Sequence, residues 1–136
     1  MQFVQNNLWL IILALASGSM LVWQSLGRGL FGVKEVGVLE ATQLINHRDA
    51  LVLDVREDKE FSAGHIPNAR HVPLGQLAAR TRELEKYRNR PIVVSCRSGA
   101  RSARACGLLG KEGFAEVYNL KGGMLVWEQS SMPLEK

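Results

Sequence analysis

The segment at residues 90–104 constrains the fold of this chain most, because it combines a strand, a tight loop and a helix in immediate succession. Residues 92–94 (Ile-Val-Val) form an apolar, β-branched run, which is typical of a buried strand. A cysteine and a small loop follow, and apolar side chains then recur with helical spacing over residues 101–109. This order places Cys96 at the positive end of a helix, where successive backbone N–H groups point at one atom.

The surroundings of Cys96 favour a reactive thiol. Arg97 and Arg101 add two cations beside the helix end, and both effects stabilise a thiolate relative to a thiol. A cysteine at the end of a strand can instead be a small buried hydrophobic residue. Such a structural cysteine needs neither two arginines nor a glycine turn at Gly99, so we interpret Cys96 as a nucleophile of lowered pKa.

The loop resembles the active-site loop Cys-Arg-x-Gly-x-Arg of the rhodanese (sulfurtransferase) family, matched here by Cys96, Arg97, Gly99 and Arg101. In tyrosine and dual-specificity phosphatases the arginine comes one position later, at the place that Ser102 holds here. The shorter ring fits a single extra sulfur atom better than a phosphoryl group. Phosphatase or arsenate reductase activity remains the alternative for this loop.

Two further motifs extend the resemblance. Residues 60–69 contain a Gly-His-Ile-Pro-x-Ala core, in which Gly64 and Pro67 predict a loop rather than a helix interior. Residues 121–127 resemble the motif that closes the family's domain with a helix. The resemblance covers nearly all of residues 36–127, and its three motifs follow the family's order, which is far more specific than the cysteine loop alone.

Apolar segments predict alternating strands and helices in a domain over residues 36–130, followed by a C-terminal tail at residues 131–136. Strands are expected at residues 36–38, 51–53, 71–72, 92–94 and 116–119, and helices at residues 40–47, 74–87 and 101–109. This alternation indicates an α/β domain, rhodanese-like by resemblance, with a largely parallel sheet flanked by helices. Functional residues gather at the carboxyl ends of parallel strands, where Cys96 and Asp54 both lie.

One transmembrane helix is predicted before this domain, within the N-terminal segment 1–27. The apolar run begins at Leu8 and ends at Leu26. At about 1.5 Å per residue, a helix of this length nearly spans a hydrocarbon layer of ~30 Å. Trp9 and Trp23 lie near its ends, as interfacial anchors do. The lipid bilayer is therefore an expected partner of this segment.

The charges around this run predict the orientation of the domain. No Lys or Arg precedes the run, whereas Arg28 and Lys34 follow it within a glycine-rich linker at residues 28–35. The positive-inside rule therefore predicts a single-pass protein of the cell inner membrane with a cytoplasmic domain; a periplasmic or other extracytoplasmic domain is the alternative. Residues 14–16 (Ala-Leu-Ala) leave a cleaved signal peptide open, although the basic segment that precedes such a peptide is missing.

Overall charge and cysteine content narrow the function. The net charge of +4 comes without a basic run that carries interleaved aromatics, so nucleic acid is not expected as a partner. Two cysteines, Cys96 and Cys106, are too few for a disulfide scaffold, and a reactive thiol suits a reducing compartment. Cys106 is expected to face the core, with a disulfide to Cys96 as the alternative.

Three residues are candidates for a supporting role. By resemblance, Asp54 and Arg56 support the active-site loop through a carboxylate–guanidinium contact; a solvated pair is the alternative. His65 is expected to fix its loop by hydrogen bonding, with general-base catalysis as the alternative. His47 and His71 are scattered, and no Cys/His cluster has zinc-ligand spacing.

The resemblance implies sulfur transfer by a covalent mechanism. The Cys96 thiolate attacks the outer sulfur of a small anionic donor similar to thiosulfate, and forms a persulfide. The cradle of that persulfide is expected from the backbone of Arg97, Ser98, Gly99, Ala100, Arg101 and Ser102. A thiol or cyanide then accepts the sulfur, and no metal or organic cofactor is needed. The alternative is a membrane-tethered, rhodanese-like binding module with little catalytic activity.

Overall fold

The computed structural model describes residues 1–30 and 33–136, and for residues 24–30 it describes the backbone alone. Two compact units make up the chain, Met1–Gly32 and Val33–Lys136. The second unit contains all strands found in the described residues. It begins three residues before the domain that the sequence predicts.

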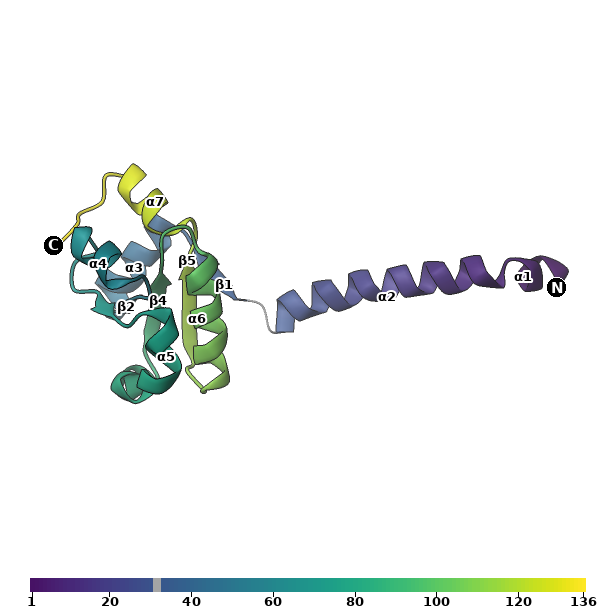
Figure 1. Ribbon diagram of the computed structural model, residues 1–136, viewed down its shortest axis with the longest axis horizontal. Coiled ribbons are helices and arrows are strands. Elements are labelled where there is room, and N and C mark those ends of the chain that lie inside the picture. The colour runs from purple at the N-terminus through teal and green to yellow at the C-terminus, as the bar shows by residue number, and fades with distance from the viewer. Residues whose placement is uncertain (31–32) are drawn as a thin grey trace. The chain divides into compact units, whose positions relative to one another are not determined.

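A five-stranded sheet forms the centre of the second unit (Figure 1). Its strands are β1 (Lys34–Val36), β2 (Leu51–Asp54), β3 (Arg70–His71), β4 (Pro91–Ser95) and β5 (Glu116–Leu120). The order across the sheet is β1-β5-β4-β2-β3, and every neighbouring pair is parallel. The prediction of an α/β domain with a parallel sheet is therefore confirmed, and β4, which precedes Cys96, is its central strand.

Helices cover both faces of the sheet (Figure 1). They are α3 (Val38–Arg48), α4 (Asp58–Ala63), α5 (Leu74–Arg80), the 3₁₀ helix η1 (Thr81–Tyr87), α6 (Ala100–Lys111) and α7 (Gly123–Gln129). Successive strand residues point to opposite faces, so Ile92 and Val94 pack with α5 and α6, and Val93 packs with α3 and α7. This two-sided burial explains why β4 is apolar over its whole length.

Three predicted elements differ from the structure. The edge strand lies at β1 and not at residues 36–38, because Gly37 is the N-cap of α3. The loop predicted at residues 60–69 is wrong in its first part, since α4 continues to Ala63 and ends at Gly64. A capping box between Glu57 and Glu60 starts this helix. The helix predicted at residues 74–87 is divided into α5 and η1.

The last residues of the chain pack back onto the loop after α4. His65 and Glu135 exchange two backbone hydrogen bonds of 2.9 and 2.8 Å. The Trp127 indole N–H donates to the Pro133 carbonyl at 3.0 Å, and the Asn68 N–H donates to the Glu135 carboxylate at 2.9 Å. The segment predicted as a tail is therefore fixed to the domain.

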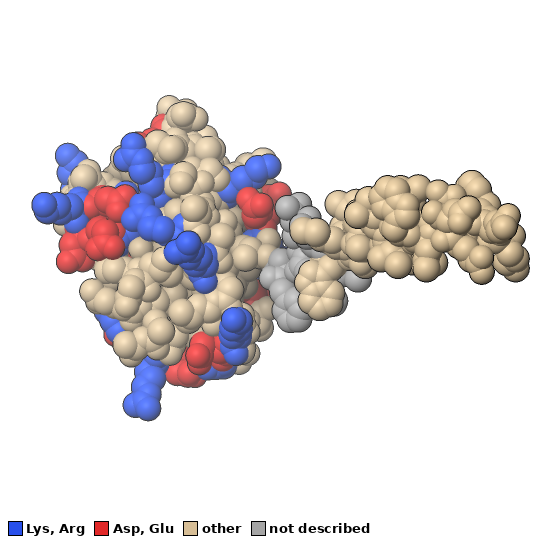
Figure 2. Space-filling model, turned by 45° about the vertical axis from the view of Figure 1, so that its right-hand side comes forward, with Lys and Arg blue, Asp and Glu red and all other residues tan. Residues whose placement is uncertain are grey.

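The first unit consists of α1 (Gln2–Asn6) and α2 (Leu8–Leu30). Residues 1–23 show a surface without charged side chains (Figure 2), on which Trp9 and Trp23 are exposed. Within the part of the chain that the structure describes, no helix combines the length and the apolar character that crossing a membrane requires. The predicted linker at residues 28–35 begins inside α2 and ends inside β1, and residues 31–32 lie outside the described residues.

Candidate active site

Cys96 lies directly after the central strand, in the short connection between β4 and α6. The residue is only 1% exposed, whereas Arg97 and Ser98 above it are exposed. Gly99 is the N-cap of α6 and has a φ of 111°, which is strained for any residue with a side chain. The thiol therefore lies beneath a tight loop at the positive end of a helix, as the sequence predicts.

Hydrogen bonds stabilise the Cys96 thiolate. The Gly99 N–H donates to Sγ at 3.0 Å, and the Ser102 hydroxyl lies 3.3 Å from Sγ. Burial raises the pKa of the Cys96 thiol, but hydrogen bonds from the Ser102 hydroxyl and from the N–H groups of Ser102, Gly99 and Ser98 outweigh it. The net result is a pKa below the ordinary value, which increases the thiolate fraction near neutral pH.

Asn119 fixes the positions of Ser102 and Gly99 through side-chain hydrogen bonds. It was not among the candidates from the sequence. Its side-chain carbonyl accepts a 2.5 Å hydrogen bond from the Ser102 hydroxyl, and its amide donates to the Gly99 carbonyl at 3.1 Å. The Ser102 hydroxyl has one hydrogen, so Sγ and Asn119 compete for it. The only sequence signal was a polar residue near the end of a predicted strand.

The first turn of α7 also contacts the Cys96 loop. The N–H groups of Met124 and Leu125 donate to the carbonyls of Cys96 and Arg97, at 2.8 and 3.1 Å. Gly123 has a φ of 57°, and a Cβ there would overlap the Cys96 carbonyl oxygen and lie 2.6 Å from the Arg97 oxygen. The glycine pair in the closing motif therefore permits a close approach of two backbones.

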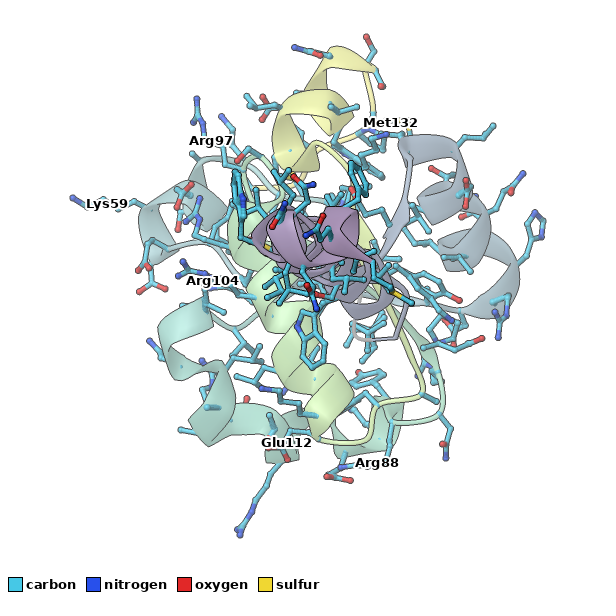
Figure 3. The ribbon with its side chains drawn as sticks, turned by 90° about the vertical axis from the view of Figure 1, so that its right-hand side faces the viewer. Lys59, Arg88, Arg97, Arg104, Glu112 and Met132 are labelled. Atoms are coloured by element: carbon cyan, nitrogen blue, oxygen red, sulfur yellow. The ribbon has the colours of Figure 1, made fainter. Side chains whose placement is uncertain are left out.

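Arg101 is paired with a carboxylate and does not stand free beside the thiol. Its two terminal nitrogens donate to the Glu60 oxygens at 2.7 and 2.9 Å. These bonds are the main cause that lowers the pKa of Glu60 to about 2. No carboxylate of the described residues lies within ion-pair distance of Arg97, which faces the same side of the domain as Lys59 and Arg104 (Figure 3).

Asp54 and Arg56 form a buried ion pair. The Arg56 Nε lies 3.0 Å from both Asp54 oxygens, and a terminal nitrogen lies 2.7 Å from Oδ2. The same guanidinium donates to the Gly64 carbonyl at 2.8 Å. The contact that the resemblance implies is present, but it supports the loop after α4, and among the described residues neither side chain forms a hydrogen bond or an ion pair with residues 96–102. Removing one partner would leave a buried charge, at a cost of about 3–5 kcal/mol.

His65 and His71 form stacking contacts and hydrogen bonds that fix the polypeptide chain around Phe61. His65 Nδ1 lies 2.9 Å from the Phe61 carbonyl oxygen, and its ring stacks on Phe61 at a centroid distance of 3.7 Å. His71 stacks on the same ring and lies 2.7 Å from the Arg56 carbonyl oxygen. Among the described residues, no group of three acidic, histidine or cysteine side chains is placed to hold a metal ion.

Cys106 faces the core on α6, as the sequence predicts. Burial, followed by the nearby charge of Cys96, raises the pKa of the Cys106 thiol to about 12. Both cysteines are free. At neutral pH Cys106 is therefore a thiol that is poorly suited to nucleophilic attack.

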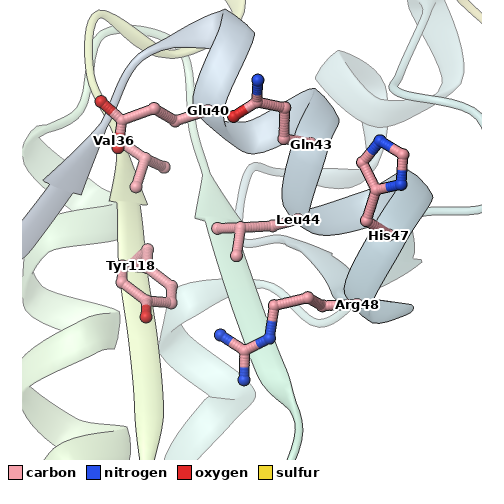
Figure 4. A pocket seen from close by; sticks show the side chains of 7 residues that line it. All are labelled: Val36, Glu40, Gln43, Leu44, His47, Arg48 and Tyr118. Carbon is pink, nitrogen blue, oxygen red and sulfur yellow. The ribbon is translucent and has the colours of Figure 1, made fainter.

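A hollow of about 400 Å³ lies elsewhere, between α3 and strands β1 and β5 (Figure 4). Val36, Leu44 and Tyr118 line it together with polar side chains of α3. Arg48 at its rim is occupied by Glu116, at 2.7 and 3.1 Å. No residue of the Cys96 loop lines this hollow.

The structure is therefore that of an α/β protein with a reactive thiol. Its cysteine follows the central strand of a parallel sheet and is enclosed by a glycine loop and the N-terminus of a helix. Residues 37–130 match the family model of the rhodanese-like domain. The chain therefore belongs to the rhodanese-like sulfurtransferase family.

Individual relatives agree with this assignment. The chain is 37% identical over 92 residues to a sulfurtransferase from Allochromatium vinosum, covering 68% of this chain and 84% of that protein. It is 34% identical to the thiosulfate sulfurtransferase GlpE from Coxiella burnetii, covering 70% and 87%. The crystal structure of a rhodanese-related protein from Thermoplasma volcanium is similar with a TM-score of 0.65 and 29% identity, covering 75% and 97%. These homologues support a transferase.

Proposed function

We propose that this protein transfers sulfane sulfur from a small anionic donor to a thiol acceptor through a persulfide on Cys96. The observation that carries the proposal is the 3.0 Å hydrogen bond from the Gly99 N–H to Sγ, in a loop that lowers the pKa of the thiol. Family membership and the sulfurtransferase relatives support the same chemistry. No cofactor enters the proposed reaction, because the sulfur is carried covalently.

The first half-reaction loads the enzyme. With thiosulfate as the donor, the Cys96 thiolate attacks the outer sulfur, the S–S bond of the donor breaks, and sulfite leaves with the electron pair. The product is a Cys96 persulfide anion, whose negative charge the loop amides and the N-terminus of α6 stabilise. In the second half-reaction a thiol, or cyanide as a test acceptor, takes the outer sulfur and regenerates the thiolate.

The size of the loop and the burial of Cys96 favour sulfur over a phosphoryl group. Only four residues separate Cys96 from Arg101, and Cys96 is 1% exposed. A terminal sulfur atom presents a single atom to such a site. A tetrahedral phosphoryl group needs room for three oxygens and donors arranged around them, which speaks against the phosphatase alternative.

The proposal predicts ping-pong kinetics. Initial rates measured against thiosulfate at several fixed concentrations of cyanide should give parallel lines in double-reciprocal plots, since donor and acceptor never occupy the site together. Sulfite should also be released in a single burst, close to one equivalent per chain, when the acceptor is omitted. Intersecting lines together with no burst would exclude a persulfide intermediate.

We further propose that residues 8–26, whose side chains the structure describes only as far as Trp23, anchor the domain to a membrane as a single helix, with the domain on the cytoplasmic side. The uncharged surface of residues 1–23, the flanking Trp9 and Trp23, and the cations at Arg28 and Lys34 support this proposal. After expression, the full chain should remain in the membrane pellet in alkaline carbonate, and a chain that lacks residues 1–27 should not. Release of the full chain into the supernatant would contradict the anchor, and protection of the domain from protease in spheroplasts would test its side.

A further inference from the structure

The pair between Arg101 and Glu60 changes the charge that a donor meets at the loop. Both terminal nitrogens of Arg101 are occupied by Glu60, at 2.7 and 2.9 Å, in a two-point arrangement that fixes the guanidinium. The two side chains are 34% and 28% exposed, so the pair is partly shielded from solvent. Arg101 is the second arginine of the Cys-Arg-x-Gly-x-Arg motif, but the Glu60 carboxylate neutralises its positive charge beside the thiol.

Glu60 is held in place independently of Arg101. It is the third residue of α4, and its carboxylate also accepts the Glu57 backbone N–H at 3.2 Å in the capping box. The hydrogen bond from Arg101 is the largest of the causes that lower the pKa of Glu60 to about 2, so the carboxylate is charged throughout the physiological range. The pair is thus a built part of the site and not a chance surface contact.

With Arg101 neutralised, Arg97 is the loop cation that no described carboxylate pairs. Apart from the Cys96 thiolate itself, the charges of Arg97, Arg101 and Glu60 sum to a single positive charge. A dianion such as thiosulfate keeps one charge uncompensated at such a site, whereas a donor with a single negative charge does not.

Resting on the function proposed above, we infer that Glu60 is a specificity-determining residue, which biases Cys96 toward persulfide donors that carry at most one negative charge and away from dianionic thiosulfate. In the corresponding step the Cys96 thiolate attacks the outer sulfur of R–S–SH and the S–S bond of the donor breaks. The R–S⁻ group leaves with the electron pair and takes the proton. The products are R–SH and the Cys96 persulfide anion, so atoms and charge balance.

The test is Glu60→Gln in the full chain, with thiosulfate and cysteine persulfide as the two donors. Glutamine keeps a carbonyl for Arg101 and for the Glu57 N–H, so α4 is retained while the negative charge is lost. A charge added at the loop acts more strongly on a dianion than on a monoanion. We therefore expect the ratio of kcat/KM for thiosulfate to that for cysteine persulfide to rise by roughly fivefold, less so at high salt.

Glu112→Gln is the matched control. It makes the same change of net charge at the far end of α6 from Arg97 (Figure 3), and should leave the ratio unchanged. In the double variant Glu60→Gln with Arg101→Met, the increase in the ratio should disappear, because the Arg101 cation that Glu60 neutralises has been removed. A gain that persists in the double variant would contradict the mechanism.

A second measurement does not depend on sulfur transfer. The ratio of alkylation rates of Cys96 by anionic iodoacetate and by neutral iodoacetamide should rise roughly fivefold in Glu60→Gln. If sulfur transfer proceeds but neither ratio changes, the inference about Glu60 is overturned while the proposed function stands. If no variant accepts sulfur from either donor, the proposed function fails, and the donor selection fails with it.

Discussion

Cys96→Ser is expected to reduce sulfur transfer by more than ~1,000-fold, because a serine hydroxyl neither ionises near neutral pH nor carries a sulfane sulfur. The change replaces the Cys96 sulfur by an oxygen atom, and the surrounding loop, including Gly99 and Ser102, is unchanged. The folded domain should therefore persist, with a loss of at most about 1–2 kcal/mol in the free energy of unfolding. Initial rates with thiosulfate and cyanide, together with urea denaturation, check both expectations.

Cys106→Ala serves as the control for this variant. Cys106 faces the core, and its thiol has a pKa raised to about 12, so it should not take part in the reaction. The control is expected to keep its activity and to lose about 1 kcal/mol of stability through a small cavity. Loss of activity in Cys106→Ala, or full activity in Cys96→Ser, would contradict the assignment of the nucleophile.

Gly123→Ala is expected to have the second largest effect, on stability and activity together. Gly123 has a φ of 57°, which strains any residue with a side chain, and the new Cβ would lie 2.6 Å from the Arg97 carbonyl oxygen. The backbone would have to shift, and the bonds from Met124 and Leu125 to the loop carbonyls would lengthen or break. We expect a loss of about 2–4 kcal/mol in the free energy of unfolding. The rate of sulfur transfer should fall by at least tenfold, measured under conditions where the variant is still folded.

Gly107→Ala separates this steric effect from a general effect of replacing glycine. Gly107 is exposed on α6, and nothing lies within 4 Å of a Cβ built there. Alanine favours a helix by up to about 1 kcal/mol over glycine, so this variant should be slightly more stable than the natural chain and equally active. Equal effects of the two substitutions would show that the close backbone approach at Gly123 contributes neither to stability nor to activity.

Local patterns were sufficient to predict the buried strands β2 and β4 and the reactive loop. The β-branched run of β4 and the apolar run of β2 reflect burial on two faces, and this requirement is visible in consecutive residues. The order of strand, cysteine, glycine and helix likewise placed Cys96 at the start of α6 without reference to distant parts of the chain.

Residues that act from a distance in the sequence were not predictable in this way. Asn119 reaches Ser102 and Gly99 from β5, and Glu60 reaches Arg101 from α4, 41 positions earlier in the chain. Neither contact has a periodic or local signature, because each depends on how strands and helices pack. The same reason explains why the fixed C-terminal segment at Glu135 could not be foreseen.

The role predicted for Arg101 shows this difference most clearly. Two arginines beside the thiol suggested two cations that stabilise its thiolate. In the structure, Glu60 occupies one of them and leaves Arg97 as the exposed charge. The spacing of the loop motif identifies which residues surround the thiol, but their net charge follows only from the tertiary contacts.

The central claim, a persulfide carried on Cys96, is tested most directly by peptide mass spectrometry. The protein is incubated with a sulfane-sulfur donor, the excess is removed, and the persulfide is trapped with an alkylating reagent before digestion. We predict one added sulfur atom on the peptide that contains Cys96, none on a peptide that contains Cys106 alone, and loss of the added sulfur after treatment with cyanide. A Cys96 peptide that stays unmodified with both thiosulfate and cysteine persulfide would contradict the account. A sulfur found only on Cys106 would contradict it as well.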